Sequence, residues 1–398
     1  MQHSYDVIVA GAGISGFAAA IGARQAGASV LLLDKRPSAG GTAVYALTPV
    51  LSGWPYPQRG GGVADMLKNY LEQRNQLIWR NDNGNTEEDA LQAAMMDMLQ
   101  SAGVEMLFDA ELIKAAAADR RIASITVKHG GEELELRAKN FVDATGDAVL
   151  TQLSGAETVI PPPELSMTKT LMFKIRNIKS FDKPSIKARF KKKTFPFAIQ
   201  TEFMGTRLLR DDEIIVNLSA VTGNAADPDD HARMYKELTA QIPVIVEWLK
   251  KEFPEFAQIE VSKIASIMGV RYSRSIVGRR QLDMLDIQSP QPPPEPVGLC
   301  GHYIGGHYVD SYDAPWGHDI PGKPAIPYGA LRSKNIDNLA ACGRIIDVDP
   351  RVVSAVRLCV SCMASGQAAG IAAALDMPEY AVLKQELIKQ NCLFEPQK

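Results

Sequence analysis

The chain lacks several features that would each point to a particular class of protein. No apolar run approaches the roughly 18 residues needed to span a bilayer, so we expect no membrane-spanning helix. The net charge of -3 over 398 residues is close to neutral, and nothing global points to nucleic acid or to an anionic membrane. The first residues, MQHSYDVIVAG, have no basic region ahead of an apolar stretch, so we expect no signal peptide.

Cysteine is also scarce. The five cysteines are an odd number and gather late in the chain, at Cys300, Cys342, Cys359, Cys362 and Cys392. That distribution does not resemble the disulfide framework of a secreted protein. No internal repeat is visible, and the length predicts roughly two or three domains. These absences favour a protein of the reducing cytoplasm.

The N-terminal segment has the pattern of a dinucleotide-binding unit. An apolar strand over 5–10 is followed by G-x-G-x-x-G, then by an alanine-rich helix and a second apolar strand over 29–34. The glycines Gly11, Gly13 and Gly16 permit a tight turn, close approach of a pyrophosphate and close helix–strand packing. Asp34 ends the second strand, where a carboxylate accepts ribose hydroxyls. The alternative is a glycine-rich turn in an unrelated α/β protein.

Further along the chain, the pattern is coarser. Residues 63–80 and 87–103 are expected to be helical, and 104–147 to form several strands with turns near 118–121 and 129–131. A long helix is expected after the acidic run that begins at Asp227. One more helix is expected from about Val356 to Leu375, and a last one over 379–390.

Several separated motifs identify the family that the chain resembles. They are GGT at 40–42, DATGD at 143–147, SMTKTLMFKI at 166–175, IPYGAL at 326–331, NLAACGRIID at 338–347 and RLCVSCMASGQAAG at 357–370. In this order and spacing they resemble the FAD-dependent oxidoreductases of the glutathione-reductase-like superfamily, with fumarate reductase flavoproteins as more distant kin. The resemblance covers nearly the whole chain and is far more specific than the glycine motif alone.

The resemblance implies an α/β fold in two parts. A Rossmann-like FAD-binding domain would form from residues 1–150 and 326–398, and a mixed α+β substrate domain from 151–325 would be inserted into it. The implied FAD-binding residues are Gly11, Gly13, Ser15, Gly16, Asp34, Lys35, Gly41, Thr42, Leu112, Thr145, Gly146, Asp147, Gly343 and Arg344. Arg36 hints at a 2′-phosphate, but Asp34 in the ribose position favours a ribose without one.

The helix near Val356 would aim its N-terminus at the pyrimidine edge of the flavin. Reduction places negative charge there, and a helix N-terminus or an arginine stabilises it. Arg357 is the side-chain candidate, and its alternative role is an ion pair with a surface carboxylate. The neighbouring pair Cys359 and Cys362 suggests a redox dithiol. However, there is no second G-x-G-x-x-G, and the resemblance favours packing against the flavin.

The segment 269–281 carries four arginines. In the resembling family, a stretch like Arg271, Ser273 and Arg274 lies near flavin and substrate. Several guanidinium groups suit a substrate that bears a carboxylate. The alternative is a salt-bridged strand between domains.

The stretch HYIGGHYVDSYDAPWGHD, residues 302–319, concentrates histidine and aspartate. The histidines are spaced by five and eleven residues, which does not match a compact zinc site, so we expect no metal centre. The resemblance makes this stretch a wall of the substrate pocket, with a purely structural loop as the alternative. Family members often carry a histidine where this chain has Tyr312. His307 and Tyr312, with Arg274, are therefore the candidates for proton transfer.

A basic stretch over 174–193 holds nine lysines and arginines with phenylalanines between them. It suits nucleic acid or an acidic lipid surface, but is more often a solvated face. We expect neither nucleic acid nor membrane as a partner, and a homo-oligomer is possible.

The function that these observations favour is hydride transfer between a small anionic organic molecule, such as a carboxylate, and the N5 atom of FAD. A nicotinamide nucleotide or oxygen would complete the cycle. The alternatives are a flavin-binding protein without turnover, a nicotinamide-dependent dehydrogenase, and a biosynthetic enzyme of the thiazole-forming type that consumes its bound dinucleotide.

Overall fold

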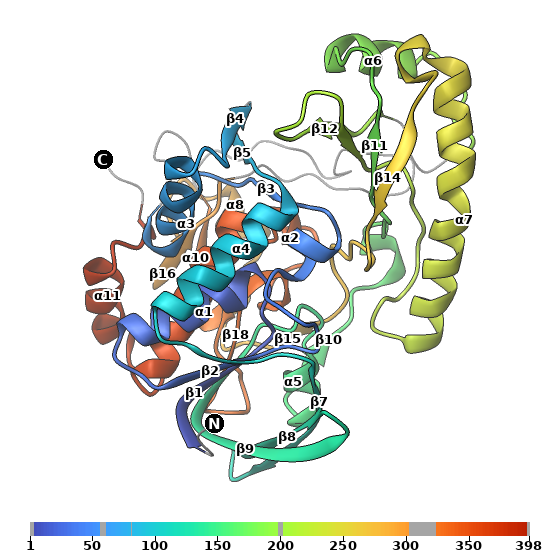
Figure 1. Cartoon of the computed structure of the whole chain (residues 1–398). Helices are drawn as coiled ribbons and strands as arrows, with labels where there is room; N and C mark the ends of the chain where they lie inside the picture. Colours follow the sequence, from blue (N-terminus) through green and yellow to red (C-terminus); the bar gives the residue numbers. More distant parts are fainter. Residues whose placement is uncertain (1–3, 56–60, 81, 198–201, 302–323, 396–398) are drawn as a thin grey trace.

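The computed structural model describes residues 4–55, 61–80, 82–197, 202–301 and 324–395. Its central layer is a parallel sheet in the order β6 (Glu105–Leu107), β2 (Val30–Leu33), β1 (Ser4–Ala10), β9 (Glu132–Asp143) and β18 (Leu339–Ala341) (Figure 1). The strands are apolar because both faces are covered. The last strand comes from the C-terminal part of the chain, so both ends of the sequence build one sheet. This is the expected α/β architecture.

Strand β9 belongs to two sheets. Its second half pairs in parallel with β1, whereas its first half pairs antiparallel with β8 (Arg121–His129), which in turn pairs with β7 (Ala110–Ala118). This antiparallel ribbon lies below the parallel layer in Figure 1. The predicted turns separate its three strands.

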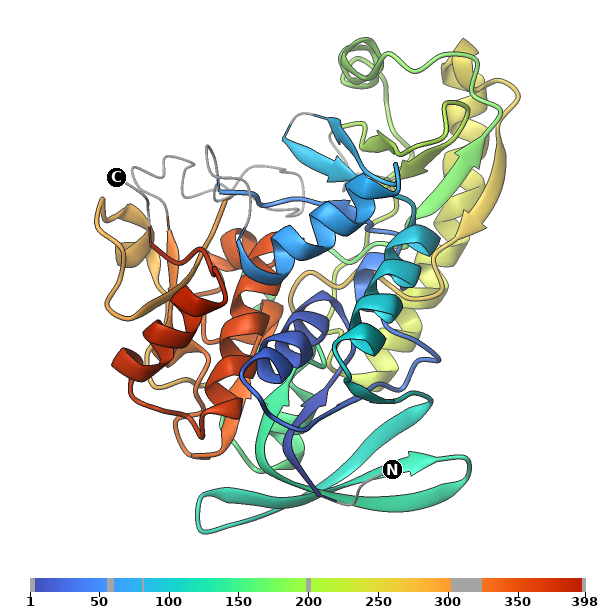
Figure 2. The same cartoon turned by 60° about the vertical axis from the view of Figure 1, so that its left-hand side comes forward.

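Helices α1 (Ile14–Gln25), α3 (Gly62–Gln73), α4 (Glu88–Ser101) and α10 (Cys359–Ala374) pack in the same hydrophobic cluster as the apolar side chains of β1 and β2. Helix α1 lies directly beside α10, although some 340 residues separate them in sequence (Figure 2). The predicted helix over 63–80 is wrong in its second part. The backbone of Asn75 has a φ of 55°, which ends the helix, and β4 (Ile78–Arg80) follows.

The helix predicted from about Val356 to Leu375 is confirmed as α10, which begins at Cys359, slightly later than predicted. A short helix α9 (Val353–Val356) ends before Leu358, which is extended and precedes α10. At the start of α10, the amide of Val360 donates to the carbonyl of Ser52, 3.1 Å away, which is distant in sequence and directly follows β3. The first turn of α10 is therefore separate from α9 and held against the residues that follow β3.

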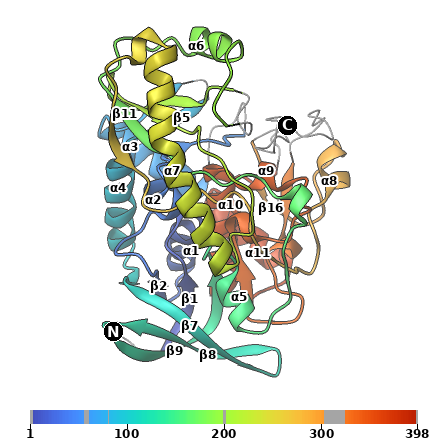
Figure 3. The ribbon, with the colours of Figure 1, turned by 90° about the vertical axis from the view of Figure 1, so that its right-hand side faces the viewer.

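A second body lies beside the first. Its antiparallel sheet has the order β12 (Gly205–Arg207), β13 (Ile214–Val216), β11 (Phe173–Arg176) and β14 (Glu260–Ile264). The expected long helix is α7 (Pro228–Glu252), capped by the side chain of Asp227 and lying lengthwise beside the sheet (Figure 3). Helix α6 (Lys183–Phe190) completes the body, whose buried side chains form their own hydrophobic cluster. The domain boundaries remain a prediction. Tyr272, Ile287 and Val297 lie within the predicted inserted domain, but their side chains pack in the first hydrophobic cluster.

The remaining elements are short. They are α2 (Gly41–Tyr45), β3 (Val50–Leu51), β5 (Asn83–Asn85), α5 (Val149–Leu153), β10 (Thr158–Val159), β15 (Ser275–Ile276), α8 (Met284–Gln288), β16 (Pro296–Leu299), β17 (Ala325–Pro327), α11 (Tyr380–Lys389) and four 3₁₀ turns, at Pro163–Leu165, Pro254–Phe256, Tyr328–Ala330 and Gly343–Ile345. Among helices within the described residues, none combines the length and apolar character needed to cross a membrane.

The basic stretch 174–193 is largely paired within the second body. Lys187 and Lys191 both bind Glu202, and Lys193 binds Glu252. Phe190 is buried against Trp248 in a cluster of aromatic rings. The phenylalanines of this stretch therefore pack in or against the second hydrophobic cluster. Because these lysines are paired with glutamates, the stretch is better interpreted as a solvated face than as a nucleic-acid surface.

Candidate functional site

Three chain turns meet at the carboxyl edge of the parallel sheet. The amide of Gly11 donates to the carbonyl of Leu33 at 2.7 Å, and the amide of Ala144 donates to that of Ala10 at 2.8 Å. The amide of Cys342 donates to the carbonyl of Asp143 at 3.0 Å. The turns after β1, β9 and β18 are thus held side by side, at the edge where open α/β sheets bind their ligands.

The glycines of the first turn are required by close backbone contacts. A Cβ atom on Gly11, whose φ is 104°, would lie 2.3 Å from the carbonyl oxygen of Ala144. A Cβ on Gly41 would lie 2.6 Å from the Cα of Gly13, so the GGT turn rests directly on the glycine-rich loop. Thr42 follows in the first turn of α2. The two turns form a backbone-lined cradle with little room for side chains.

Helix α1 points its N-terminus into this cradle. Its N-cap, Gly13, offers no side-chain hydrogen bond, and its first turn contains no acidic residue. Amide groups at such a helix start, together with the helix dipole, bind phosphate. Gly13, Ser15 and Gly16 therefore lie where a pyrophosphate would sit.

Asp34 is fixed against the same loop. Its two carboxylate oxygens accept from the amide of Ala12 at 2.6 Å and from the amide of Arg36 at 2.8 Å. Burial raises the pKa of Asp34, while these two hydrogen bonds act in the opposite direction. Each oxygen keeps a lone pair for a ribose hydroxyl. Lys35 is exposed beside it, and Leu112 lies on β7 opposite Val127, packed against a hydrophobic cluster.

The turn after β9 is organised by Asp143, which the sequence analysis did not assign to the site. Its side chain is completely buried and accepts four hydrogen bonds. The amide and hydroxyl of Thr145 donate at 3.0 and 2.7 Å, and those of Thr151 donate at 2.8 Å each. Burial raises the pKa of this carboxyl. The sequence signal that could have identified Asp143 is an acidic residue at the end of an apolar strand, followed by two threonines.

The turn after β18 closes the cradle from the other side. A Cβ on Gly343 would lie 2.8 Å from the hydroxyl of Ser15. Arg344 forms an ion pair with Asp147 at 3.2 Å, and a Cβ on Gly146 would lie 2.8 Å from its guanidinium. In the described structure, the buried Nε of Arg344 has no hydrogen-bond partner. An unsatisfied cationic donor beside the helix N-terminus fits a phosphate-bearing ligand.

The predicted arginine–serine–arginine stretch reaches this edge from the second half of the chain. The hydroxyl of Ser273 donates to the Asp147 carboxylate. Arg274 donates to the backbone oxygen of Asp147 at 3.4 Å and to the side-chain oxygen of Gln152. Arg271 donates to the carbonyl of Thr168 at 2.5 Å. Each of the three side chains is at most 8% exposed, so they form a buried polar cluster.

Lys169 lies near Arg271 of this cluster, and the sequence analysis did not predict it as a site residue. It lies in the SMTKTLMFKI run, which the sequence analysis used only as a family motif. The side chain is completely buried, and its ammonium donates to the hydroxyl of Ser166 at 2.6 Å and to the carbonyl of Met167 at 3.0 Å. Burial and the nearby Arg271 lower its pKa to about 8. A lysine inside an apolar run was the signal that could have found it.

The cysteine pair lies in the first turn of α10. Both thiols are free, and burial raises the pKa of Cys359 to about 11 and that of Cys362 to about 12. Reactive dithiols need a lowered pKa, so the contacts favour the packing interpretation. Arg357 lies just before α10, and it and Arg344 both act to lower the pKa of Cys362.

Two proton-transfer candidates, His307 and Tyr312, lie outside the described residues, as does the whole stretch 302–319. Within the described ranges, no cluster of three or more histidine, cysteine, aspartate or glutamate side chains could hold a metal ion.

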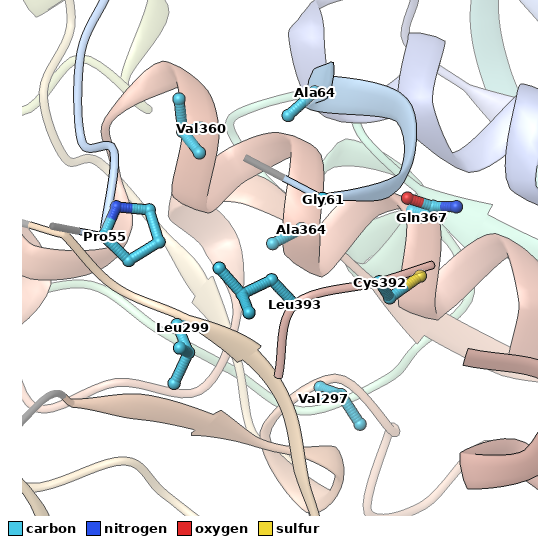
Figure 4. A pocket seen from close by; sticks show the side chains of 10 residues that line it. All are labelled: Pro55, Gly61, Ala64, Val297, Leu299, Val360, Ala364, Gln367, Cys392 and Leu393. Carbon is cyan, nitrogen blue, oxygen red and sulfur yellow. The ribbon is translucent and has the colours of Figure 1, made fainter. Parts of the chain in front are cut away.

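A separate pocket lies on the side of α10 that faces α3 and the C-terminal segment. Its walls are mainly apolar, and Figure 4 shows Val360, Ala364 and Gln367 of α10 opposite Leu299 and Leu393. The side-chain oxygen of Gln367 also accepts a hydrogen bond from the amide of Val63 at 2.9 Å, so this oxygen already has a partner within the protein. None of the predicted site residues lines this pocket.

Residues 6–387 match the family described as FAD dependent oxidoreductase. The chain belongs to that family. Its cofactor is FAD, and its activity at the family level is that of an FAD-dependent oxidoreductase.

Two relatives with assigned functions match parts of the chain. A NADH:fumarate oxidoreductase of Klebsiella pneumoniae (strain 342) is 24% identical, over 36% of this chain and 20% of that protein. A fumarate reductase (cytochrome) of Shewanella frigidimarina is 40% identical, over 16% of this chain and 11% of that protein. The matched regions thus span a fifth or less of these relatives.

A solved structure has the same fold over nearly the whole chain. It is a geranylgeranyl bacteriochlorophyll reductase-like protein from Thermoplasma acidophilum, with a TM-score of 0.50 and 14% identity. The match covers 98% of this chain and 82% of that chain. At this identity the likeness extends to the fold alone.

Proposed function

We propose that this protein oxidises or reduces a small anionic organic molecule by hydride transfer at FAD. The observation that carries the proposal is a pair of buried cations beside the ATGD turn. Among the described residues, Lys169 and Arg274 donate only to uncharged acceptors. Keeping a buried cation without an anion is costly, and a substrate carboxylate would supply the missing charge.

The cradle would hold the cofactor. The turns at Gly11, Gly13 and Gly343 would take the pyrophosphate, Asp34 would accept the ribose hydroxyls, and Arg344 would add a charged donor. When bound, FAD supplies a centre that accepts or donates a hydride. Arg357 and the N-terminus of α10 would stabilise negative charge next to it.

Arg274 would orient the substrate. Its guanidinium is held by Gln152 and by the backbone oxygen of Asp147, and part of the fork remains to bind a carboxylate in two-point geometry. Ser273 and Arg344 both donate to the same carboxylate oxygen of Asp147, which anchors this support to the ATGD turn. A proton must leave or join the substrate with each hydride, and Arg274, His307 and Tyr312 are the proposed groups.

The test is flavin reduction without oxygen. Purified holoprotein is mixed with a panel of hydroxy, amino and saturated organic acids, and the loss of flavin colour is followed. The reverse arm adds unsaturated acids to chemically reduced protein. We expect at least one acid to change the flavin spectrum and its neutral amide to fail. A protein whose flavin responds to none of them would be a flavin-binding protein without this activity.

The matched variants are Arg274→Gln, Arg274→Lys and, as control, Arg279→Gln, which removes an exposed arginine paired with Asp337. Losing a charge-assisted hydrogen bond of about 1.5–3 kcal/mol predicts a fall in kcat/KM of roughly tenfold to a hundredfold for Arg274→Gln. Arg274→Lys should recover only part of it. A fall in kcat/KM for Arg279→Gln as large as that for Arg274→Gln would contradict the assigned role.

A further inference from the structure

Lys169 has an unusual position for a lysine. Its backbone forms a two-way bridge with Val221, with hydrogen bonds of 2.8 and 3.0 Å, which ties it to the second body. Its side chain is completely buried, and no carboxylate lies within ion-pair distance among the described residues. Fully buried lysines are rare unless paired, so this arrangement requires a reason.

The hydrogen bonds of Lys169 suit the neutral amine as well as the ammonium. An amine has two N–H donors and one lone pair, and the hydroxyl of Ser166 and the carbonyl of Met167 accept both donors. The lone pair is then left to receive a proton. In the ammonium form, a third N–H is left without an acceptor within the described part of the chain.

The charges around Lys169 come from three other segments. Arg271, which donates to the carbonyl of Thr168, disfavours a second positive charge nearby. Asp147 after β9 and Asp230 on α7 favour it more weakly, and each is already bonded to an arginine, Arg344 and Arg233 respectively. An anion entering this cluster would therefore change the balance at Lys169.

We propose that Lys169 and Arg271 form a buried subsite for one carboxylate of the substrate, and that Lys169 takes up a proton when that carboxylate binds. The inference rests on the proposed function and names the group that recognises its substrate. An incoming carboxylate supplies the missing acceptor for the third N–H and offsets the repulsion from Arg271. Binding would thus convert the amine into an ion-paired ammonium.

The sign of the pH dependence follows from linkage. The pKa of Lys169 without ligand is about 8. Below that pH the group already carries its proton, so binding takes up none. Near pH 8, binding takes up about half a proton, and at higher pH the fraction rises while affinity falls. The anion raises the pKa, so uptake and not release is expected.

The first measurement needs no variant and no turnover. Acetate, malonate, succinate and inorganic phosphate are titrated into holoprotein by calorimetry, in two buffers with different ionisation enthalpies. The difference in heat gives the protons exchanged on binding. We expect a carboxylate to bind with about half a proton taken up near pH 8 and almost none near pH 6.5. Carboxylate binding without uptake at both pH values, or no carboxylate binding at all, would overturn the proposal.

Two variants locate the proton. Lys169→Met should lose uptake and weaken carboxylate binding at least tenfold, whereas Lys169→Arg keeps the charge and should bind without uptake. Lys334→Met, which removes an exposed lysine paired with Glu157, is the control and should match wild type. Uptake that persists in Lys169→Arg assigns the proton elsewhere. Phosphate binding that exceeds carboxylate binding would give the subsite to a phosphate group instead.

The outcomes separate this inference from the proposed function. If carboxylates bind with proton uptake but none changes the flavin, the subsite stands and the oxidoreductase proposal fails. If organic acids reduce the flavin while Lys169→Met keeps binding and uptake, the function stands and the role of Lys169 fails. Far-ultraviolet circular dichroism and flavin content show whether each variant is folded.

Discussion

Individual residues at this site owe their properties to burial more than to their chemical type. Asp34 and Asp143 are both acids at strand ends, but Asp34 keeps lone pairs that face the cradle, whereas Asp143 uses its side chain to fix the next turn. Lys169 and Lys174 are both buried lysines close in sequence. Only Lys174 has carboxylate partners, so only Lys169 has its pKa lowered.

Asp143→Asn tests the anchoring of the ATGD turn. Each oxygen of Asp143 accepts from one backbone amide and one hydroxyl. An asparagine must point its NH₂ group at one of those amides, whichever way it is flipped, which leaves a buried donor unsatisfied. We expect a loss of about 1–3 kcal/mol in the free energy of unfolding, measured with denaturant, together with weaker FAD retention.

The control for this variant is Asp337→Asn at an exposed ion pair, which should cost about 0–1 kcal/mol and leave FAD content unchanged. A stable Asp143→Asn protein with full FAD content would remove Asp143 from the site.

At the scale of elements, α1 and α10 are held together by glycine. A Cβ on Gly366 would lie 2.1 Å from the carbonyl oxygen of Ser15, and one on Gly370 would lie 2.0 Å from that of Ala19. The SGQAAG motif therefore lets two helices from opposite ends of the chain approach at backbone distance. The contact at Ser15 lies in the first turn of α1, so this packing also positions the phosphate cradle.

Gly366→Ala and Gly370→Ala should separate these two effects. Both force backbone apart, and each should destabilise the protein by about 1–3 kcal/mol in thermal or denaturant unfolding. Only Gly366→Ala pushes on the start of α1, so it should also weaken FAD binding, measured by titrating the cofactor into flavin-free protein. Ala374→Gly at the end of α10 is the control, with a loss of about 1 kcal/mol. Equal effects of the two glycine variants on FAD would refute the distinction.

A buried ion network joins α4 to the second sheet. The ammonium of Lys174 on β11 lies 2.7, 2.8 and 3.3 Å from carboxylate oxygens of Glu87, Glu88 and Glu213. Lys263 reaches Glu88 from the partly exposed side at 2.9 Å. Burial alone would raise the pKa of Glu88, but hydrogen bonds from the two lysines hold it below the ordinary value. The network fixes the position of one body against the other.

Lys174→Met should cost about 3–5 kcal/mol at neutral pH, because it leaves buried carboxylates without their cation. Lys263→Met, which removes a half-exposed partner, should cost at most about 1 kcal/mol. In wild type, the stability from Glu88 is present above its unfolded pKa and is lost as pH falls through its lowered pKa in the folded protein. In Lys174→Met the carboxylates bind protons more readily, so its deficit should shrink between pH 7 and about pH 4.5, measured by urea unfolding. A deficit that grows on acidification would contradict this account.

At the scale of the whole molecule, the two largest hydrophobic clusters suggest two units of stability. The first cluster combines N- and C-terminal residues, and the second is built almost entirely from residues 171–268. The predicted phosphate-binding turn lies between β1 and α1, both of which contribute to the first cluster. We propose that the two units unfold with separate dependence on FAD, as the predicted division into a cofactor domain and an inserted domain requires.

Tryptophan reporters can measure that division. Trp54 packs in the first cluster and Trp248 against the second, so variants retaining one of them report each unit. FAD at about 100 times its Kd should stabilise the unit that binds it by about 2.7 kcal/mol. We expect the Trp54 signal to shift to higher temperature more than the Trp248 signal. Identical shifts would mean that the chain unfolds as one unit.

The sequence by itself determined the features that depend on local geometry. The glycine-rich turn, Asp34, the strands between residues 104 and 147 and the capped helix at Asp227 follow from neighbouring residues whose backbone preferences are strong. The family motifs also predicted the α/β fold and FAD, because their order and spacing along the chain are specific to the family.

Only the tertiary structure decided which distant residues meet. Gln152 bonds to Arg274, and Lys169 lies near Arg271, across large separations in sequence and with no periodic pattern, so these contacts could not be predicted. Nor could the contact at the start of α10, where the amide of Val360 bonds to Ser52 across the fold. The charge state of a buried lysine depends on desolvation and on neighbours from other segments, and the folded chain alone brings these together.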